Sequence, residues 1–138
     1  MDGKIFDQVI SILIGPGSSY SYVSHELVDK CGLSKELHAE YWLRQLVGVT
    51  KKLVQHWVRV CVFDLNGMPT TTHLNVLPLG SYSMLLGMDW LYLHRTKVDC
   101  YENAIKCLGE NGEPRVLYGN KKATSVWMLT YTQERIVT

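Results

Sequence analysis

Short runs of apolar and β-branched residues, separated by turn residues, dominate the hydrophobic pattern of the chain. Residues 9–14 read Val-Ile-Ser-Ile-Leu-Ile and lead directly into Gly15-Pro16-Gly17. A nearly continuous apolar run that stops at glycine and proline is typical of a buried strand. One or two strand segments are therefore expected within residues 5–14.

Two short helices interrupt the strand pattern. Ser21 or Ser24 can cap the first one, and Gly32 stands where a left-handed C-terminal cap is expected. Its apolar face would consist of Val23, Leu27, Val28 and Cys31. The second helix begins at Gly87, with Asp89 in the first turn, where a carboxylate interacts favourably with the helix dipole. Its apolar positions on one face are Met88, Leu91 and Tyr92.

Hairpin patterns fill most of the remaining chain. Two strands are expected at 41–49 and 53–65, joined by an exposed link at 48–52, and Asn66-Gly67 predicts a tight turn into a strand at 70–77. Apolar residues alternate on both faces of 57–63, which predicts a strand covered on much of both faces. Further short strands are expected at 83–86, 98–101, 104–108 and 115–118, the last two joined by a turn at Asn111-Gly112.

This arrangement predicts a mostly β, closed barrel-like domain with one or two short helices. The pattern fades after Gly119, so we expect a domain at 1–119 and a C-terminal tail or extension at 120–138. A chain of 138 residues suits a single domain.

The overall charge and hydropathy argue against several classes of function. The net charge is +1 without a sustained basic stripe, so no nucleic-acid partner is expected. The mean hydropathy of −0.03 and the short apolar runs give no expected membrane span, and no signal peptide is recognisable. We therefore expect a cytoplasmic, intracellular protein.

Four cysteines and five histidines show no spacing typical of a metal site, so neither a metal nor a cofactor is expected. If Tyr101 pairs with Ala104 in a hairpin, Cys107 faces Val98 rather than Cys100. Cys31, Cys61, Cys100 and Cys107 are therefore expected to be reduced thiols.

Two segments carry a resemblance to a known family. Residues 76–91 read Val-Leu-Pro-Leu-Gly-Ser-Tyr-Ser-Met-Leu-Leu-Gly-Met-Asp-Trp-Leu, and residues 13–33 combine a strand, a tight small-residue loop and a helix. The chain resembles the retropepsin-like aspartic proteases of gypsy-type long-terminal-repeat retrotransposon polyproteins, particularly plant ones, over about residues 5–118. The resemblance implies an acid-protease barrel that forms a two-fold homodimer. It also implies two facing carboxylates, which share one proton and activate a water.

The sequence departs from the family at the expected catalytic loop. Gly15 takes the place of the family's catalytic aspartate, and Pro16 the place of its serine or threonine, while Gly17, Ser18 and Ser19 fit the pattern. Glycine has no side chain to activate water, and proline offers no N–H or hydroxyl donor. No catalytic residue is therefore expected to be intact.

The resemblance assigns roles to two other parts of the chain. Residues 48–51 (Gly48, Val49, Thr50 and Lys51) correspond to the flap that closes over substrate, although a plain exposed turn would show the same pattern. Gly87 and Asp89 would be structural residues near the site. A persisting cleft could bind an extended peptide or protein segment by strand addition.

The sequence gives only weak indications of other catalytic or binding groups. The carboxylates of Asp7, Asp29, Asp64 and Asp99 lie on no family motif, and Ser18, Ser19 or Ser24 would need an oriented partner such as His25 to act as a nucleophile. The glycine-rich turn at 15–19 lacks the lysine of a phosphate-binding loop. The aromatic residues Tyr20, Tyr22, Trp57, Trp90 and Tyr92 are expected in the core or in an interface.

Three hypotheses follow from the sequence. The chain is a catalytically inactive relative that acts as a dimerisation or binding module, or it is a polyprotein-processing aspartic protease disabled by an Asp-to-Gly change at position 15. The third hypothesis is hydrolysis by a group outside the family pattern.

Overall fold

The computed structural model describes the backbone of residues 1–44 and 52–120, and the side chains of residues 1–37 and 56–120. The elements are β1 (Asp2–Ile5), β2 (Gln8–Ile14), β3 (Tyr22–Val23), α1 (His25–Cys31), β4 (Glu36–Arg44), β5 (Lys52–Leu65), β6 (Met68–Val76), β7 (Met84–Leu86), α2 (Met88–Leu93), β8 (Lys97–Asp99), β9 (Ala104–Leu108) and β10 (Pro114–Tyr118).

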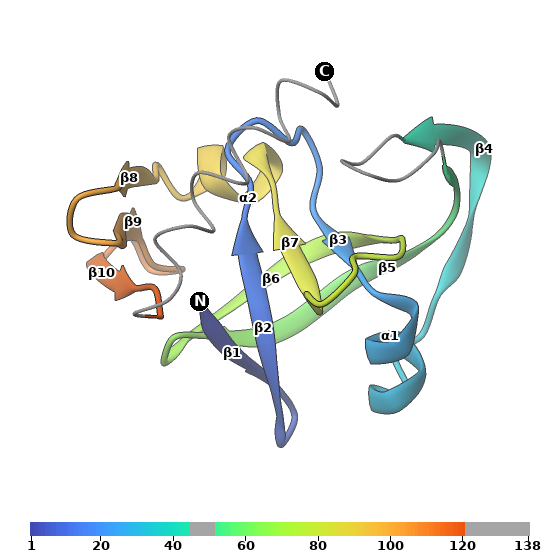
Figure 1. Ribbon diagram of the computed structural model, residues 1–138, viewed down its shortest axis with the longest axis horizontal. Coiled ribbons are helices and arrows are strands. Elements are labelled where there is room, and N and C mark those ends of the chain that lie inside the picture. Colours follow the sequence, from blue (N-terminus) through green and yellow to red (C-terminus); the bar gives the residue numbers. More distant parts are fainter. Residues whose placement is uncertain (45–51, 121–138) are drawn as a thin grey trace.

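Six strands close into a barrel. The large sheet has the order β1-β2-β7-β3-β6-β5-β4, and β1 also pairs with β5, so that the ring closes and β4 remains outside it as the edge strand. Figure 1 shows this barrel with α1 on one side and the small sheet β10-β9-β8 on the other. The predicted mostly β barrel with two short helices is confirmed.

The strand β7 lies between the two strands that flank the loop at residues 15–21. It pairs in parallel with β2, where Ile14 lies beside Leu86, and antiparallel with β3, where Tyr22 lies beside Leu85. The loop begins at the end of β2 and finishes at the start of β3. Because β7 pairs with both strands, it holds both ends of the loop.

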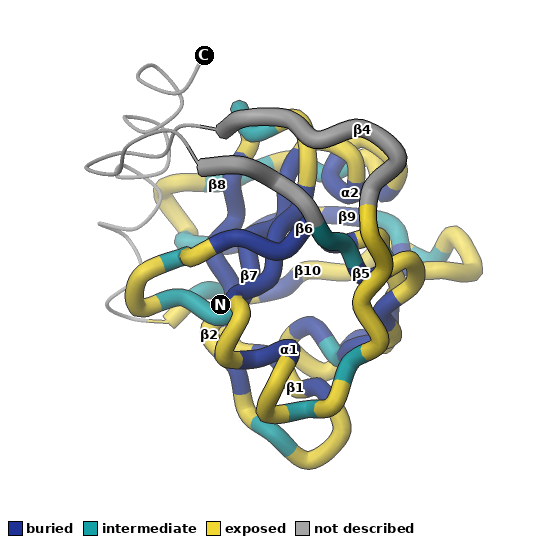
Figure 2. The backbone as a smooth tube through the Cα atoms, turned by 90° about the vertical axis from the view of Figure 1, so that its right-hand side faces the viewer, coloured by how far each residue is buried: buried dark blue, intermediate teal, exposed yellow. Residues whose placement is uncertain are grey.

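Apolar side chains pack on both sides of this part of the sheet. The larger cluster fills the barrel and includes Ile12, Leu65, Leu74, Met84 and Leu86, all fully buried. A smaller cluster on the other side, below the loop, contains Leu13, Tyr22, Leu77 and Leu85. Figure 2 shows the buried backbone concentrated in the central strands and the exposed backbone in the outer turns.

The predicted turns have a clear conformational basis. The β5–β6 turn places both Asn66 (φ 52°) and Gly67 (φ 90°) in the left-handed region, which asparagine and glycine tolerate best. The Asp64 carboxylate accepts the Gly67 N–H at 2.7 Å and completes the turn. The turn at Asn111-Gly112 also lies where the sequence predicted it, between β9 and β10.

Several boundaries differ from the predictions. Val23 belongs to the strand β3 rather than to the first helix, which begins only after its cap Ser24, whose Oγ accepts the Leu27 N–H at 3.2 Å. The strand predicted at 41–49 starts earlier, at Glu36, and β6 starts at Met68 rather than at residue 70. Asp99, not Tyr101, pairs with Ala104, so Cys107 does not face Val98.

The prediction that residues 57–63 are covered on both faces is wrong. Val60 and Val62 are 58% and 67% exposed, whereas Cys61 and Phe63 point into the core. The pairing with β6 shifts in register between Val58 and Cys61. Val58 faces the core before this shift, and Cys61 and Phe63 face it afterwards. All four cysteines are free, and burial, followed by the nearby Cys31 thiol, raises the pKa of Cys61 to about 11.

The predicted flap residues 48–51 and most of the predicted tail lie outside the described residues. Within the described part, no helix has the length and apolar character needed to cross a bilayer.

The barrel closure gives a first testable prediction. A Cβ atom at Gly3 would lie 2.5 Å from the carbonyl oxygen of Asp64 on β5 and 2.5 Å from the Ile12 side chain. Gly3→Ala should therefore lower the free energy of unfolding by about 1–3 kcal/mol, as expected of overpacking. Urea unfolding measures this, with Lys4→Ala on the exposed side of β1 as the control. Equal stability of the two variants would contradict the tight closure.

Candidate active site

Backbone hydrogen bonds, within the loop and to β7, hold the loop between β2 and β3. The Gly15 N–H donates to the Leu86 carbonyl of β7 at 2.8 Å, and the Ser18 N–H donates to the Gly15 carbonyl at 3.0 Å. The Ser18 hydroxyl donates to the Tyr20 carbonyl at 2.8 Å. Gly15 is buried, Pro16 and Ser19 are exposed, and the loop presents its tip to solvent.

The first turn of α2 packs directly against this loop. The N–H groups of Met88 and Asp89 donate to the carbonyls of Ser18 (2.6 Å) and Ser19 (3.2 Å). These donors have no partner within the helix, so the loop satisfies them. The contact requires glycine at position 87, because a Cβ there would overlap the Tyr20 carbonyl oxygen and lie 2.6 Å from that of Ser18.

The Asp89 carboxylate fixes the end of the loop through Ser21. Its Oδ1 accepts the Ser21 hydroxyl at 2.6 Å, and its Oδ2 accepts the Ser21 N–H at 3.1 Å. Oδ1 also accepts the Trp90 N–H at 2.8 Å, while the Ser21 hydroxyl accepts the Gly87 N–H at 2.9 Å. Ser21 is fully buried. The Asp89 carboxylate thus joins the end of the loop to the start of α2 through three hydrogen bonds.

Position 15 offers no carboxylate, and the nearest side chain is apolar. A Cβ atom built on Gly15 would lie 3.0 Å from the Leu85 Cδ2 atom, and Gly15 is not among the glycines with a positive φ. An aspartate could therefore occupy this backbone if Leu85 gave way by a few tenths of an ångström.

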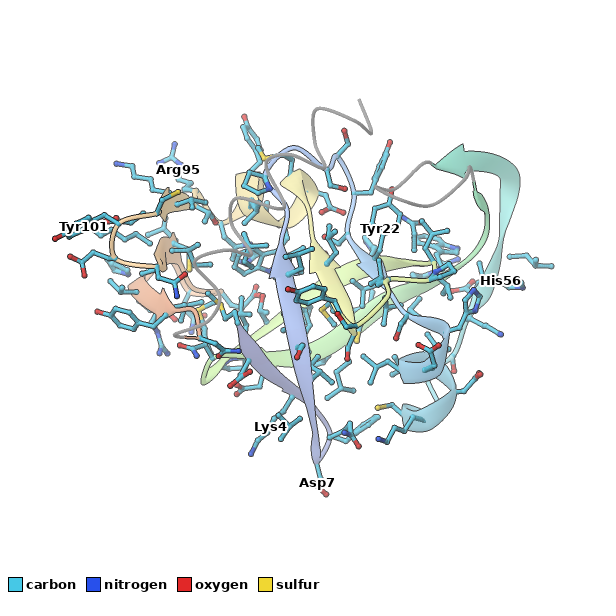
Figure 3. All side chains as sticks on the ribbon, viewed as in Figure 1. Lys4, Asp7, Tyr22, His56, Arg95 and Tyr101 are labelled. Carbon is cyan, nitrogen blue, oxygen red and sulfur yellow. The ribbon has the colours of Figure 1, made fainter. Side chains whose placement is uncertain are left out.

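The other acids considered in the sequence have places away from the loop. Asp64 and Asp99 cap turns, accepting the N–H groups of Gly67 (2.7 Å) and Glu102 (3.0 Å). Asp29 lies exposed on α1, and Figure 3 shows Asp7 at the tip of the β1–β2 hairpin, far from α2. None of these four carboxylates is brought to Gly15.

The alternative chemistries also lack support in the geometry. Ser24 is the buried cap of α1, and no described contact joins His25 to a serine. The loop at 15–21 leads into the strand β3 rather than into a helix, so it does not form a phosphate-binding helix start. Within the described residues, no group of three or more His, Cys, Asp or Glu side chains could hold a metal ion.

The aromatic residues divide between core and surface. Tyr22 and Trp90 are buried, whereas Tyr20 is partly exposed and Tyr92 is 81% exposed. Met88, Leu91 and Tyr92 share one face of α2, as predicted, but only Leu91 among them is buried; together with Pro16 they line a surface hollow of about 520 Å³.

One polar cluster escaped the sequence analysis. Thr70 of β6, Trp90 and His94 at α2, and Glu110 of the β9–β10 turn meet beside the barrel. These residues come from three elements that are distant in sequence, and no motif spacing links them. Only the fold could have revealed the cluster.

The comparisons with known proteins agree with this architecture. The family profile described as "Retroviral aspartyl protease" matches residues 3–113. The crystal structure of the retroviral protease-like domain of Ddi1 from Leishmania major is similar, with a TM-score of 0.63 and 19% sequence identity, over 87% of this chain and 94% of that one. A search of curated proteins gave no match. The chain therefore belongs to the retroviral aspartyl protease family and has its retropepsin-like fold.

The Asp89 contacts give a second prediction. Asp89→Ala removes the acceptors of two N–H groups and of the buried Ser21 hydroxyl, and should lower the free energy of unfolding by about 1.5–3 kcal/mol. Thermal unfolding compares it with Asp29→Ala, an exposed acid on α1 that should change stability by no more than about 0.5 kcal/mol. If Asp89→Ala is as stable as the unaltered chain, the carboxylate does not organise the loop.

Proposed function

We propose that this chain is a degenerate, catalytically inactive retropepsin-like domain, derived from the aspartic endopeptidase of a gypsy-type, plant retrotransposon polyprotein. In this account it acts inside the cell as a dimerisation module that binds a peptide or protein. The observation that supports it is a loop whose backbone is hydrogen-bonded to β7 and to α2 but which carries glycine at position 15.

The loss of activity follows from the chemistry of the family. Hydrolysis needs a carboxylate pair, in which one group activates water and the other, protonated, stabilises the oxyanion. In a symmetric dimer, one Gly15 per chain removes both groups. No other described carboxylate replaces them, because Asp89 is committed to Ser21 and the Trp90 N–H.

The second candidate is a polyprotein-processing aspartic protease that carries an Asp-to-Gly change at position 15. Its support is that an aspartate could stand on the Gly15 backbone once Leu85, 3.0 Å from the Cβ position, gives way by a few tenths of an ångström. Pro16 favours natural divergence, because disabling the enzyme would not require a second change. The two differ in the natural coding sequence, in which an aspartate codon at position 15 would identify a disabled protease.

The proposed homodimer has a candidate surface beside the loop. Tyr92 and Leu93 of α2 are 81% and 74% exposed, and Met88 and Pro16 continue this apolar surface toward the loop. Contiguous exposed apolar groups commonly mark an interface. A two-fold axis here would bring the two loops together, and the cleft between them would take an extended peptide by strand addition.

Restoring the acid tests the proposed role of position 15. Gly15→Asp should show acid-favoured peptide cleavage roughly 10²- to 10⁴-fold above the unaltered chain, which is the worth of a general base. Pro16 withholds the hydroxyl and N–H found in the family, so Gly15→Asp with Pro16→Ser should cleave faster still. Cleavage of a peptide library, with and without pepstatin, provides the measurement.

The control is Gly15→Asn, which fills the same space without an ionisable group and should stay inactive. Complete inactivity of a folded, dimeric Gly15→Asp/Pro16→Ser variant would contradict the assignment of position 15.

The dimer surface gives a fourth prediction. Tyr92→Glu places a charge on the apolar face of α2 and should weaken self-association at least tenfold, by roughly the amount that a central aromatic contact contributes. Sedimentation velocity over a concentration series measures it. The control is Phe6→Glu at the opposite end of the molecule, also an exposed aromatic residue. A folded monomer at high concentration in the unaltered chain would refute the dimer.

A further inference from the structure

A half-exposed carboxylate closes the polar cluster beside the barrel. Glu110 reaches from the β9–β10 turn, and its Oε1 accepts the Thr70 hydroxyl, the Thr71 N–H at 3.2 Å and the His94 Nε2–H at 3.3 Å. Three donors on one oxygen favour the ionised form. The Thr70 hydroxyl first, then His94 and the Thr71 N–H, accordingly lower the pKa of Glu110 against the opposing effect of burial.

His94 and Thr70 orient the Glu110 carboxylate. The Nε2 atom of His94 faces that carboxylate, and its Nδ1 lies 3.0 Å from the Trp90 carbonyl oxygen. The Thr70 hydroxyl donates to Glu110, accepts the Trp90 indole N–H at 3.0 Å and lies 3.5 Å from the His94 Nε2. The cluster thus joins the β9–β10 turn to both β6 and α2.

Packing fixes the position of the His94 ring. Its side chain is only 5% exposed, against 46% for that of Glu110, so water reaches the pair from the Glu110 side. The ring stacks on the Trp90 indole, with centroids 4.2 Å apart and planes at 16°. The stack keeps Nε2 directed at the carboxylate.

The other charged groups near the pair bind elsewhere. Arg115 and Glu113 of the same hairpin pair with each other at 3.8 Å, and Arg95 is exposed after α2. From β6 the cluster receives only the uncharged Thr70 and Thr71. The ionised form of Glu110 is therefore stabilised chiefly by Thr70, Thr71 and His94.

We propose that the Glu110 carboxylate is a pH-gated latch that holds the β8–β9–β10 sheet on the barrel, closed only while Glu110 is ionised. A carboxylate with a lowered pKa stabilises the closed form above its ordinary pKa and loses that effect as the pH falls through the lowered value.

Glu110 and His94 lie at the junction of the small sheet, the barrel and α2. The His94 carbonyl accepts the Leu108 N–H of β9 at 2.8 Å, so His94 also binds the small sheet through its backbone. Behind it, Ile105, Cys107 and Leu117 of the small sheet are buried against the barrel. His94 also caps the C-terminal end of α2, whose first turn holds the loop at Gly15.

Nuclear magnetic resonance on the full chain tests the latch. Hydrogen-exchange protection of the Thr71 and Leu108 amides, corrected for intrinsic rates, should be high at about pH 6. It should fall at least tenfold toward about pH 3, as expected when a local contact opens.

Matched variants assign the acid-side loss to one carboxylate. Glu110→Gln should abolish the loss of protection at low pH, whereas Glu102→Gln, an exposed acid in the neighbouring β8–β9 turn, should keep it. Protection in the unaltered chain that does not change between about pH 6 and about pH 3 would overturn the proposal. So would a loss that persists unchanged in Glu110→Gln.

Discussion

The bond between the Asp89 carboxylate and Ser21 is the constraint on which the candidate site depends. It joins the start of α2 to the end of the loop, and Gly87 allows the helix to approach closely enough for its free N–H groups to bind the loop carbonyls. None of these contacts involves the side chain at position 15. The loop can therefore keep its shape whether glycine stands there or, once Leu85 has given way slightly, an aspartate.

The same contacts suit the proposed inactive domain, because none of them depends on an acid at position 15. In the proposed dimer, glycine in place of two facing carboxylates would remove a repulsion between like charges. The exposed apolar residues Tyr92 and Leu93 of α2 remain available for the proposed self-association, and β7 still pairs with the strands at both ends of the loop.

The sequence predicted the parts of the fold that local chemistry determines. Asn66-Gly67 and Gly32 marked their turn and cap because few residues tolerate a left-handed backbone, and the apolar run before Gly15 marked β2. Pattern alone failed where tertiary contacts decide. Val23 forms a two-residue strand only because β6 and β7 lie beside it, and Val60 and Val62 face solvent because a register shift turns β5. The positions of Gly87 and Asp89 beside the loop followed from family motifs. The cluster of Glu110 and His94 could not be foreseen, because it joins a turn to a helix end that is not its sequence neighbour.

The most direct test of the account is the turnover of a peptide library by the purified, unaltered chain over a pH series from about pH 2 to about pH 7, because a carboxylate pair that shares one proton operates between its two pKa values, about 1.5 and 4.7 in pepsin. The account predicts no cleavage above that of a matched blank, even at protein concentrations at which the chain is a dimer. Pepstatin-sensitive cleavage at the rate of an ordinary aspartic protease would contradict it, because Gly15 could then not be the empty catalytic position.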